Sequence, residues 1–540
     1  PSNHTNFADI AQPNSGNTSY ATQSGTDGIA DVDQTGDDNF SNVIQTGALD
    51  DAVIIQSGTN NSSIAAQFGD DAIADVEQSG SDNTSEVTQI GNLNEGDILQ
   101  SGDGNTSFVT QGGADELAIV TQDGEFSSST INQFGTENGA NVAQTGFDLN
   151  GNLATNASTV SQSGNLNVAD VAQVGDENVS TVVQNGSDGA AFVVSGGAGN
   201  NSAITQSNAF NGADVLQDGD NNTSVAVQSG TDGTILVSQV SDDSSSIVTQ
   251  TGDLTLSIVD QSGTNQTANI NQSSAGPLGF ASLNAAAQVN QTGDGNTANI
   301  TQSGGIGTFT NAIAGSPLGS GQVANITQDG TTNSATVAQS GQSNIARFTQ
   351  LGELNNAVVT QNGGDGDVLF TQNGDGNMVN VTQSLLAAPG AIAFAAPNQT
   401  GNNNASTILQ NGAVTGFFTT QAITTQTGDD NTSGVTQSGS DDRVFVDQIG
   451  NRNMSTVTQN VGGVTNAGDI NQSGDDGLSE LTQSGDSNIA TLNQGGTFNE
   501  SFITQDGLTN TATVTQGGMM DVSTVNQMGA GNTVTVSQNP

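Results

Sequence analysis

The stretch Gln100-Ser-Gly102-Asp-Gly-Asn105-Thr-Ser107-Phe-Val109-Thr-Gln111 decides the fold of this 540-residue chain, because its pattern recurs almost from end to end. With insertions set aside, glutamine returns every eleven residues at 44 of 45 phased positions, and the exception is Ser195. Two residues after this position, Gly occupies 38 of 45 places; two residues before it, 38 of 45 are Val, Ile or Leu. A period this regular indicates a repeat architecture.

Each repeat joins a strand to a turn. Asn105, Ser107, Val109 and Gln111 alternate with other side chains at the two-residue period of a β-strand. The segment around Gly102 supplies the turn, because glycine tolerates positive φ. A single strand of about six residues cannot bury its own face, so two repeats form a 22-residue coil and coils stack. We predict an all-β, long, flattened two-sheet β-solenoid of the cross-β type, with about 22 coils.

The inward side chains of this solenoid would be Asn, Ala or Ser, Val or Ile, and Gln. Buried amides are costly alone, but stacked about 4.8 Å apart they can bond to the same residue in the coils above and below. The residues predicted to form this structural ladder are Gln45, Gln56, Gln67, Gln78, Gln89, Gln100, Gln111, Gln302 and Gln516, together with Asn105, Val109 and Gly102.

The predicted domain organisation is one continuous solenoid over residues 1–540. Insertions into the period predict loops near 145–155, 273–284, 303–321, 384–392, 411–419 and 460–465. All of these except the first leave the same edge of the solenoid. Proline cannot donate to a strand ladder, so Pro397 is expected in or beside a loop, and Gln421 is expected inside one.

Two adjacent pairs of these loops are unusually apolar. One interpretation is local, with a small cluster inside each enlarged arc. The other is a lateral contact between neighbouring fibres or subunits, because stacked loops could merge into an exposed apolar patch. The candidate lateral-contact residues are Phe280, Phe309, Phe394, Phe417 and Phe418.

Composition excludes several functions. The chain has 54 Asp and Glu against three Arg and no Lys, a formal charge of −51, so it cannot neutralise nucleic-acid phosphates. It has no cysteine for disulfides or thiolate metal sites. No apolar run approaches the roughly 18–20 residues of a membrane helix, so we expect no membrane insertion. The single histidine, His4, has no catalytic constellation around it, and we expect no enzyme.

No cofactor is expected. Acidic turns such as Gly36-Asp-Asp-Asn39 and Gly428-Asp-Asp-Asn431 offer the oxygen ligands that Ca²⁺ prefers. Their eleven-residue period differs, however, from that of the nine-residue calcium-binding β-roll repeat. Diffuse screening by cations is therefore favoured over ordered Ca²⁺ sites, and salt or divalent cations are expected to promote assembly.

The repeat resembles the curlin repeat of curli fibre subunits, with Gln followed by Gly at +2, Asn at +5, Ala or Ser at +7 and Gln at +11. Asn296-Thr-Ala298-Asn-Ile300-Thr-Gln302 and Asn510-Thr-Ala512-Thr-Val514-Thr-Gln516 are close matches, and the resemblance covers nearly the whole chain. It implies a secreted, bacterial functional amyloid of the biofilm matrix that assembles by nucleation. This chain carries many more repeats than the familiar subunits.

We therefore predict a structural subunit of an extracellular curli-like fibre, serving biofilm matrix and adhesion. The solenoid ends carry the repeat without an evident cap, so copies are expected to polymerise head-to-tail into a homopolymer, with lateral bundling as a further option. We expect the protein to be secreted to the cell surface or the extracellular space, and, because the chain starts with Pro1 rather than Met, we expect that a leader has been removed.

Two alternatives remain open: a monomeric β-solenoid adhesin or surface stalk, and an ice-binding solenoid. Outward threonines, as at Thr511, Thr513 and Thr515, favour the second. Other residue types interrupt a regular threonine array at the place before the glutamine, namely Asp447, Asp260, Leu216 and Ala143.

Overall fold

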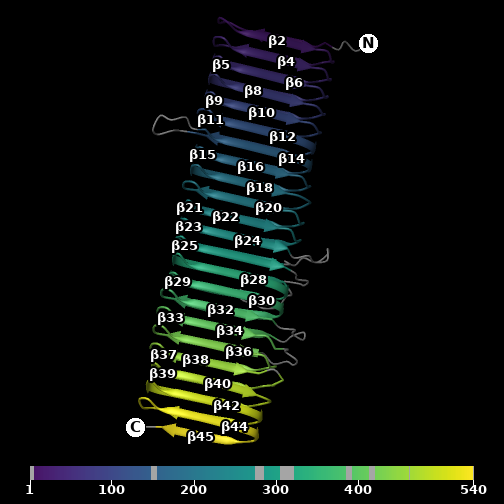
Figure 1. Ribbon diagram of the computed structural model, residues 1–540. Coiled ribbons are helices and arrows are strands. Elements are labelled where there is room, and N and C mark those ends of the chain that lie inside the picture. Colours follow the sequence, from purple (N-terminus) through teal and green to yellow (C-terminus); the bar gives the residue numbers. More distant parts are fainter. Residues whose placement is uncertain are drawn as a thin grey trace. The chain divides into compact units, whose positions relative to one another are not determined.

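The computed structural model describes residues 5–146, 155–273, 285–303, 321–384, 392–412, 420–460 and 462–538. These residues form 45 β-strands and no helix, in two compact units, Pro1–Thr251 and Gly252–Pro540 (Figure 1). Accordingly, the described part of the chain offers no apolar helix of membrane-spanning length. In each unit the odd-numbered strands form one sheet, called sheet A, and the even-numbered strands form a second, called sheet B.

The N-terminal unit contains eleven strands in each sheet. Its sheet A consists of Phe7–Ala11 (β1), Ile29–Gln34 (β3), Asp51–Thr59 (β5), Ile73–Ser81 (β7), Glu95–Asp103 (β9), Leu117–Asp123 (β11), Gly139–Thr145 (β13), Val168–Asp176 (β15), Ala190–Ala198 (β17), Gly212–Asp218 (β19) and Thr234–Asp242 (β21). Its sheet B consists of Thr18–Gln23 (β2), Phe40–Gln45 (β4), Ser62–Gln67 (β6), Thr84–Gln89 (β8), Thr106–Gln111 (β10), Ser128–Thr136 (β12), Ala157–Asn165 (β14), Val179–Gln184 (β16), Asn201–Gln206 (β18), Thr223–Gln228 (β20) and Ser245–Gln250 (β22).

The C-terminal unit is built in the same way. Its sheet A consists of Thr255–Thr264 (β23), Ala285–Asp294 (β25), Gln322–Thr331 (β27), Ile345–Glu353 (β29), Gly366–Asn373 (β31), Ala393–Thr400 (β33), Thr420–Thr427 (β35), Arg443–Ile449 (β37), Ala467–Asp475 (β39), Ile489–Thr497 (β41), Thr511–Gln516 (β43) and Thr533–Gln538 (β45). Its sheet B consists of Thr267–Ser273 (β24), Thr297–Ser303 (β26), Ser334–Gln342 (β28), Asn356–Gly364 (β30), Met378–Gln383 (β32), Ala405–Gln410 (β34), Thr432–Gln437 (β36), Met454–Gln459 (β38), Leu478–Ser484 (β40), Glu500–Leu508 (β42) and Val522–Ala530 (β44).

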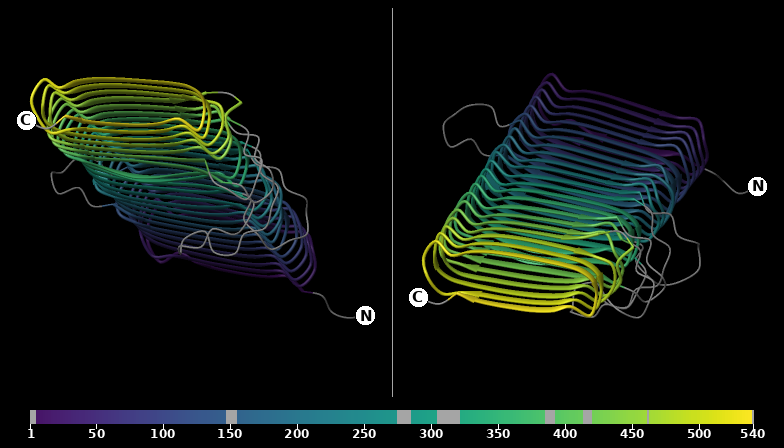
Figure 2. Two further views of the ribbon diagram at one scale, coloured as in Figure 1. Left: turned by 90° about the horizontal axis from the view of Figure 1, so that it is seen from below. Right: turned by 60° about the horizontal axis from the view of Figure 1, so that its bottom comes forward.

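Neighbouring strands of a sheet are parallel and in register. Between β10 and β12, for example, Thr106 lies opposite Ser128 and Gln111 lies opposite Gln133, one 22-residue turn further along the chain. Figure 2 shows two layers of strands in each unit, joined by arcs at both edges. The predicted fold, a two-sheet β-solenoid with about 22 residues per turn, is confirmed for each unit. Its continuity over residues 1–540 stays a prediction.

The interior lies between the two sheets and is lined by one face of every strand. In β10 and the residue before it, Asn105, Ser107, Val109 and Gln111 are all at most 1% exposed, whereas the intervening residues point outward. The small Ala and Ser side chains allow close approach of the two sheets. The core of the described residues therefore consists of columns of similar side chains that repeat from turn to turn.

The arcs are close-packed against one another, which explains their glycines. A Cβ atom added at Gly58 would lie 1.9 Å from the carbonyl oxygen of Gly80 in the next turn, and Gly58 also has a φ of +119°. Gly36 does not have positive φ, yet its Cβ would lie 1.5 Å from the oxygen of Gly58. Close approach is therefore the more general requirement for glycine, and positive φ applies only to some arcs.

The left-handed residue that many arcs share lies four positions after the glutamine. Asp38, with φ of 58°, and Asn60, with φ of 62°, occupy it, and after glycine these residue types are among those that adopt this conformation most readily. Leu49 and Leu93 adopt it as well, with φ of 63° and 60°. Sequence reasoning assigned the positive φ to the glycine and missed this position.

Three loop predictions in the C-terminal unit were wrong. Pro397 and Phe394 lie inside β33, and Gln421 lies inside β35, where it points outward while Gln426 occupies the ladder. The register between β31 and β33 is interrupted opposite Pro397, because proline has no N–H. The side-chain oxygen of Asn398 accepts a hydrogen bond from the Thr371 N–H at 3.0 Å. This side-chain bond joins β31 and β33 beside the interruption.

The remaining loop predictions fall largely outside the described residues. They concern residues 147–154, 274–284, 304–320, 385–391, 413–419 and 461, and with them Phe280, Phe309, Phe417 and Phe418. The lateral-contact prediction for these phenylalanines stays a prediction. Phe394 is half-buried on the outer face of β33 and lies opposite Gln421 of β35.

Candidate functional site: the stacked amide ladders

The glutamines form two hydrogen-bonded ladders in each unit, one at the end of each sheet. Gln45 Nε2 donates to Gln67 Oε1 at 2.9 Å, and Gln67 Nε2 donates to Gln89 Oε1 at 3.1 Å. In the other ladder of this unit, Gln56 donates to Gln78 and Gln78 to Gln100, both at 2.8 Å. Each amide is therefore donor and acceptor along the stack, which satisfies a buried polar group in every turn.

Each glutamine also joins the two sheets. Gln45 Nε2 donates to the Ile29 carbonyl oxygen at 2.7 Å, at the start of a strand in the opposite sheet, and to the Asp50 oxygen at 3.1 Å. Gln111 repeats this arrangement with Glu95 and Glu116 at 2.8 and 2.9 Å. Because the nitrogen must face these carbonyl oxygens, the orientation of the amide is fixed and every ladder runs in one direction.

The asparagine column works differently from the expected amide-to-amide ladder. Asn105 Oδ1 accepts the backbone N–H of Ser127 at 2.9 Å, and Asn105 Nδ2 donates to the Gly124 carbonyl oxygen at 3.0 Å. The Asn105 N–H in turn donates to Asn83 Oδ1 at 2.9 Å. The asparagine side chain, which is shorter than that of glutamine, thus bonds mainly to the backbone of the next turn. These bonds hold the arc of that turn in place.

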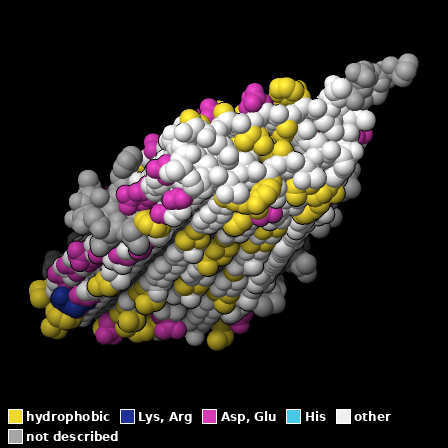
Figure 3. Space-filling view, turned by 90° about the horizontal axis from the view of Figure 1, so that it is seen from above, with side chains coloured by type: hydrophobic (Ala, Val, Ile, Leu, Met, Phe, Trp, Pro, Cys, Tyr) yellow, Lys and Arg dark blue, Asp and Glu magenta, His cyan; other side chains and the backbone are white. Residues whose placement is uncertain are grey.

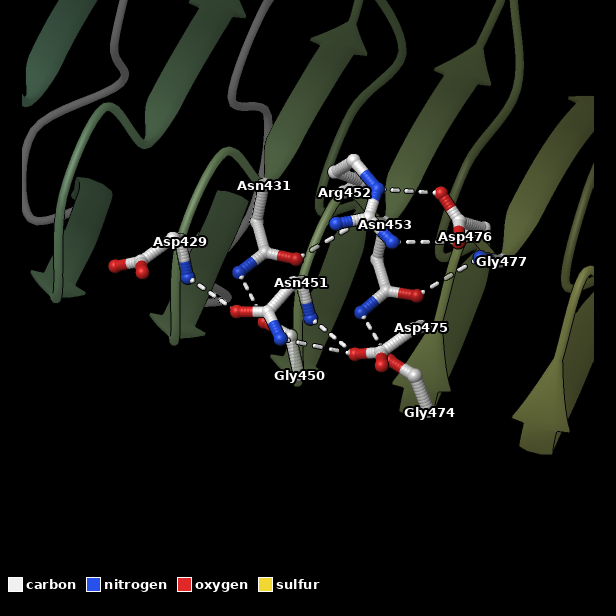
Figure 4. Close-up of polar contacts among 10 residues, drawn as sticks. All are labelled: Asp429, Asn431, Gly450, Asn451, Arg452, Asn453, Gly474, Asp475, Asp476 and Gly477. Carbon is white, nitrogen blue, oxygen red and sulfur yellow. Dashed lines mark hydrogen bonds and ion pairs between the residues drawn. The ribbon is translucent and has the colours of Figure 1, made fainter.

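Figure 4 shows this arrangement in the C-terminal unit. Asn453 Oδ1 accepts the Gly477 N–H at 2.9 Å, and the Asn453 N–H donates to Asn431 Oδ1 at 3.0 Å. An outer column runs beside it, where the Asn451 N–H donates to Asp475 Oδ1 at 2.8 Å. Carboxylates in the arcs therefore contribute acceptors for the backbone of the preceding turn.

Arg452 and Asp476, in successive arcs of the same edge, form an exposed ion pair. Two nitrogens of the guanidinium bond the two carboxylate oxygens at 2.7 and 2.8 Å (Figure 4). The guanidinium lowers the pKa of Asp476 by this hydrogen bonding and by its charge. Within the described residues, no three His, Cys, Asp or Glu side chains converge in a way that could hold a metal ion.

The glutamine ladder of sheet A in the N-terminal unit has one defect, at Ser195. Gln173, one turn earlier, donates to Ser180 Oγ at 2.9 Å, because Ser195 is too short to reach. The Ser195 hydroxyl donates to Gln217 Oε1 at 3.4 Å, a long hydrogen bond. The sequence marks this position as the single departure from glutamine.

Acidic residues replace asparagine at some turns of the buried column. Asp442 and Glu116 are the two most affected, and burial raises the pKa of each to about 7. Asp442 Oδ1 accepts the Asn466 N–H at 3.0 Å, as an asparagine would, but its second oxygen stands where asparagine carries a donor. Glu116 Oε1 accepts a bond from Asn138 Nδ2 at 3.1 Å. Both sites favour a protonated carboxyl.

The two outer faces of the N-terminal unit differ in charge. A single consensus for all repeats hides this difference, because odd and even repeats lie on different sheets. In the six-residue segment that ends at each ladder position, three side chains point outward, so each sheet of this unit has 33 such positions. Sheet B carries one carboxylate among them, Glu86. Sheet A carries ten, namely Asp9, Asp31, Asp33, Asp51, Asp75, Glu77, Glu95, Asp97, Asp170 and Asp214. Burial, followed by repulsion from neighbouring carboxylates, raises the pKa of Asp75 and of Asp97.

The structure places every residue of the predicted ladder in one of these columns. Gln302 accepts from Gln272 at 2.9 Å and donates to Gln339 at 2.8 Å. Gln516 accepts from Gln494 at 2.9 Å and donates to Gln538 at 3.0 Å. Val109 stacks between Val87 and Ile131. A Cβ atom added at Gly102 would lie 1.9 Å from the carbonyl oxygen of Gly124 in the next turn.

These observations define the class of protein: a two-sheet β-solenoid held by polar ladders rather than by a catalytic or metal centre in its described part. Comparison with known families matches the curlin associated repeat at residues 50–80, 80–113, 324–352, 421–450, 428–460 and 485–518. The chain therefore carries curlin associated repeats in several places along its length, as the resemblance in its sequence predicted. The curlin repeat is a structural and not an enzymatic element. A search of curated proteins finds no match.

Proposed function

We propose that this protein is a structural subunit of an extracellular, curli-like amyloid fibre, which serves biofilm matrix and adhesion, and that copies polymerise end to end. The family supports a self-assembling role. The direction of the glutamine ladders is the observation that carries the end-to-end part of the proposal, because it makes the two terminal turns complementary.

Apart from the break at Ser195, the ladder bonds described above run from Nε2 of one turn to Oε1 of the next in both units. Gln23 donates to Gln45 at 2.7 Å near one end, and Gln516 donates to Gln538 at 3.0 Å near the other. The first rungs, Gln12 and Gln23, therefore present amide oxygens, and the last rungs present amide N–H groups. Head-to-tail contact matches donors to acceptors, whereas head-to-head contact would oppose two rows of oxygens.

The first turn also exposes side chains of the interior type. Ile10 of β1 is 40% exposed, although the equivalent Val32 of β3 is fully buried. A β-edge with unpaired backbone groups and matching side chains is a template for another chain. Covering β1 and β2 with the last turn of another copy would bury Ile10 and add one rung to each ladder.

The test is negative-stain electron microscopy of the full-length chain in about 0.15 M salt, with growth rates measured from preformed seeds. We expect unbranched fibres. The double variant Gln527→Leu and Gln538→Leu should slow elongation at least about tenfold, since two buried amide donors are lost at the growing edge. The matched outward variant Asn526→Leu and Ser537→Leu should elongate normally.

Two outcomes contradict this proposal. Monodisperse particles at every salt concentration would support the monomeric adhesin or stalk instead. Equal elongation rates for the inward and outward variants would show that growth does not use the ladders.

A further inference from the structure

We infer that sheet B of the N-terminal unit is a side-pairing face, on which the same face of a second copy packs. The inference does not depend on end-to-end growth, because side pairing doubles the mass of single molecules and the width of fibres alike. It rests on the charge difference between the two sheets of this unit, and not on the phenylalanine-containing loops.

The occupant follows from electrostatics. A second copy carries the same charge of −51, so it is repelled by any surface rich in carboxylates. Sheet A of this unit presents ten outward carboxylates, and the arcs add more, whereas sheet B presents only Glu86. Figure 3 shows one side of the molecule, where rows of hydrophobic side chains alternate with uncharged ones and acidic side chains lie mostly toward the margins. Two sheet B faces can therefore meet with almost no carboxylate to desolvate.

The side chains of this face suit such a contact. The β-branched residues Thr, Val and Ile predominate on this face. Several of its apolar side chains are substantially exposed, with exposed fractions of 40% for Phe108, 41% for Val179 and 43% for Ile247. Successive rows lie about 4.8 Å apart, so the rows of a second face can interdigitate as they do between paired sheets of cross-β assemblies. Covering these exposed apolar groups removes them from water, which lowers the free energy of the paired state.

The area is sufficient. Eleven strands at about 4.8 Å spacing, with about six residues of about 3.3 Å each, give a face of about 1,000 Å² per copy. Stable protein–protein interfaces bury about 800 Å² per partner. Long-range repulsion between the two copies remains, and salt screens it, so pairing should strengthen as the salt concentration rises.

The experiment measures side pairing of the full-length chain by sedimentation velocity, and by fibre width where fibres are present. Thr130→Glu with Thr181→Glu places two carboxylates on the sheet B face. The matched control, Thr121→Glu with Ala172→Glu, places two on sheet A at similar heights. The half-pairing concentration is the chain concentration at which half of the copies are paired. We expect the first variant to raise it at least about tenfold, and the control to change it by less than about threefold. Circular dichroism verifies that both variants keep their strands.

A second pair of variants avoids any risk to folding, because each removes one exposed or half-exposed charge. Glu86→Thr clears the only carboxylate from sheet B, and Glu77→Thr removes one from sheet A of the adjacent turn. The net charge changes equally. We expect Glu86→Thr to lower the half-pairing concentration about threefold and Glu77→Thr to lower it by clearly less.

Equal effects within either pair of variants would overturn the inference, since general repulsion and not this face would then control association. Unchanged pairing in the Thr130 and Thr181 variant would also overturn it. If that variant paired normally but lost retention on a neutral glucan that holds the wild-type chain, the face would belong to a carbohydrate instead.

Discussion

Thr110 and Gln111 are neighbours in β10, but they lie in opposite environments. Gln111 is fully buried and bonded to the turns before and after it, while Thr110 is half-buried on the outer face. Inside, each turn must present the same group at the same place, because its partner is that group in the next turn. Outside, no such partner exists, and residue types vary freely. Stability therefore depends on the interior columns, and the outer faces are available for recognition.

Truncating Gln111 and Thr110 separately tests whether stability depends on the interior column and not on the outer face. Gln111→Ala leaves the amide oxygen of Gln133 and the nitrogen of Gln89 without their ladder partner and opens a cavity, so we expect the free energy of unfolding to fall by about 3–5 kcal/mol. Thr110→Ala should change it by less than about 0.5 kcal/mol. Chemical denaturation measures both, and equal losses would contradict the distinction.

Glycines test the same distinction in the backbone. Gly58→Ala should destabilise by about 3 kcal/mol, because the new Cβ meets the Gly80 oxygen and the φ of Gly58 is +119°. Gly139 lies in β13, and a Cβ added there meets nothing within 4 Å. Gly139→Ala should therefore leave stability unchanged or raise it slightly. Thermal melts of the two variants provide the measurement, and the account fails if they shift together.

The acidic members of the asparagine column add a pH dependence to the interior. Burial raises the folded-state pKa of Asp442 from 3.8 to about 7, so the folded chain binds this proton more tightly than the unfolded chain. The stabilisation is complete below about pH 4 and is lost as the pH rises through about 7.

Asp442→Asn should remove this dependence. At pH 8 we expect the variant to be more stable than the wild type by about 2–4 kcal/mol, and at pH 4 we expect no difference. Asp506, which is exposed near the end of β42, provides the control as Asp506→Asn. Chemical denaturation at pH 8 and pH 4 measures the free energy of unfolding of both variants. A gain in stability of the same size at pH 4 would show that ionisation of Asp442 is not its cause.

The smallest expected effect comes from repairing the ladder. Ser195→Gln should restore the rung between Gln173 and Gln217 and stabilise the N-terminal unit by about 1 kcal/mol. Hydrogen exchange of the neighbouring strands β15 and β19 measures this locally. The outward substitution Val194→Gln serves as the control, and should have no such effect.

Much of the fold follows from the period alone. Eleven residues with a β alternation determine which side chains point inward, and stacking then determines that Gln111 meets Gln89 and Gln133. The period does not determine how an amide is used. Asparagine is one methylene shorter than glutamine, and it bonds mainly to the backbone of the arc, as Asn105 does with Gly124 and Ser127.

The outer faces were missed for a different reason. Odd and even repeats lie on different sheets, so one consensus averages two unlike faces. The four interruptions of the threonine array, Asp447, Asp260, Leu216 and Ala143, all lie on sheet A strands and say nothing about sheet B. Reading alternate repeats separately would have shown the charge difference. Pro397 could not be foreseen in a strand, because the repeat pattern does not reveal the local interruption in pairing or the Asn398–Thr371 bond beside it.

The most direct test of the central claim is a cryo-electron microscopy reconstruction of fibres grown from the full-length chain. We predict turns spaced about 4.8 Å apart and a subunit junction at which β44 and β45 of one copy pair with β1 and β2 of the next, so that the glutamine columns continue without a break. A junction made through loops or through the outer faces, with the glutamine columns ending at each subunit, would contradict the account.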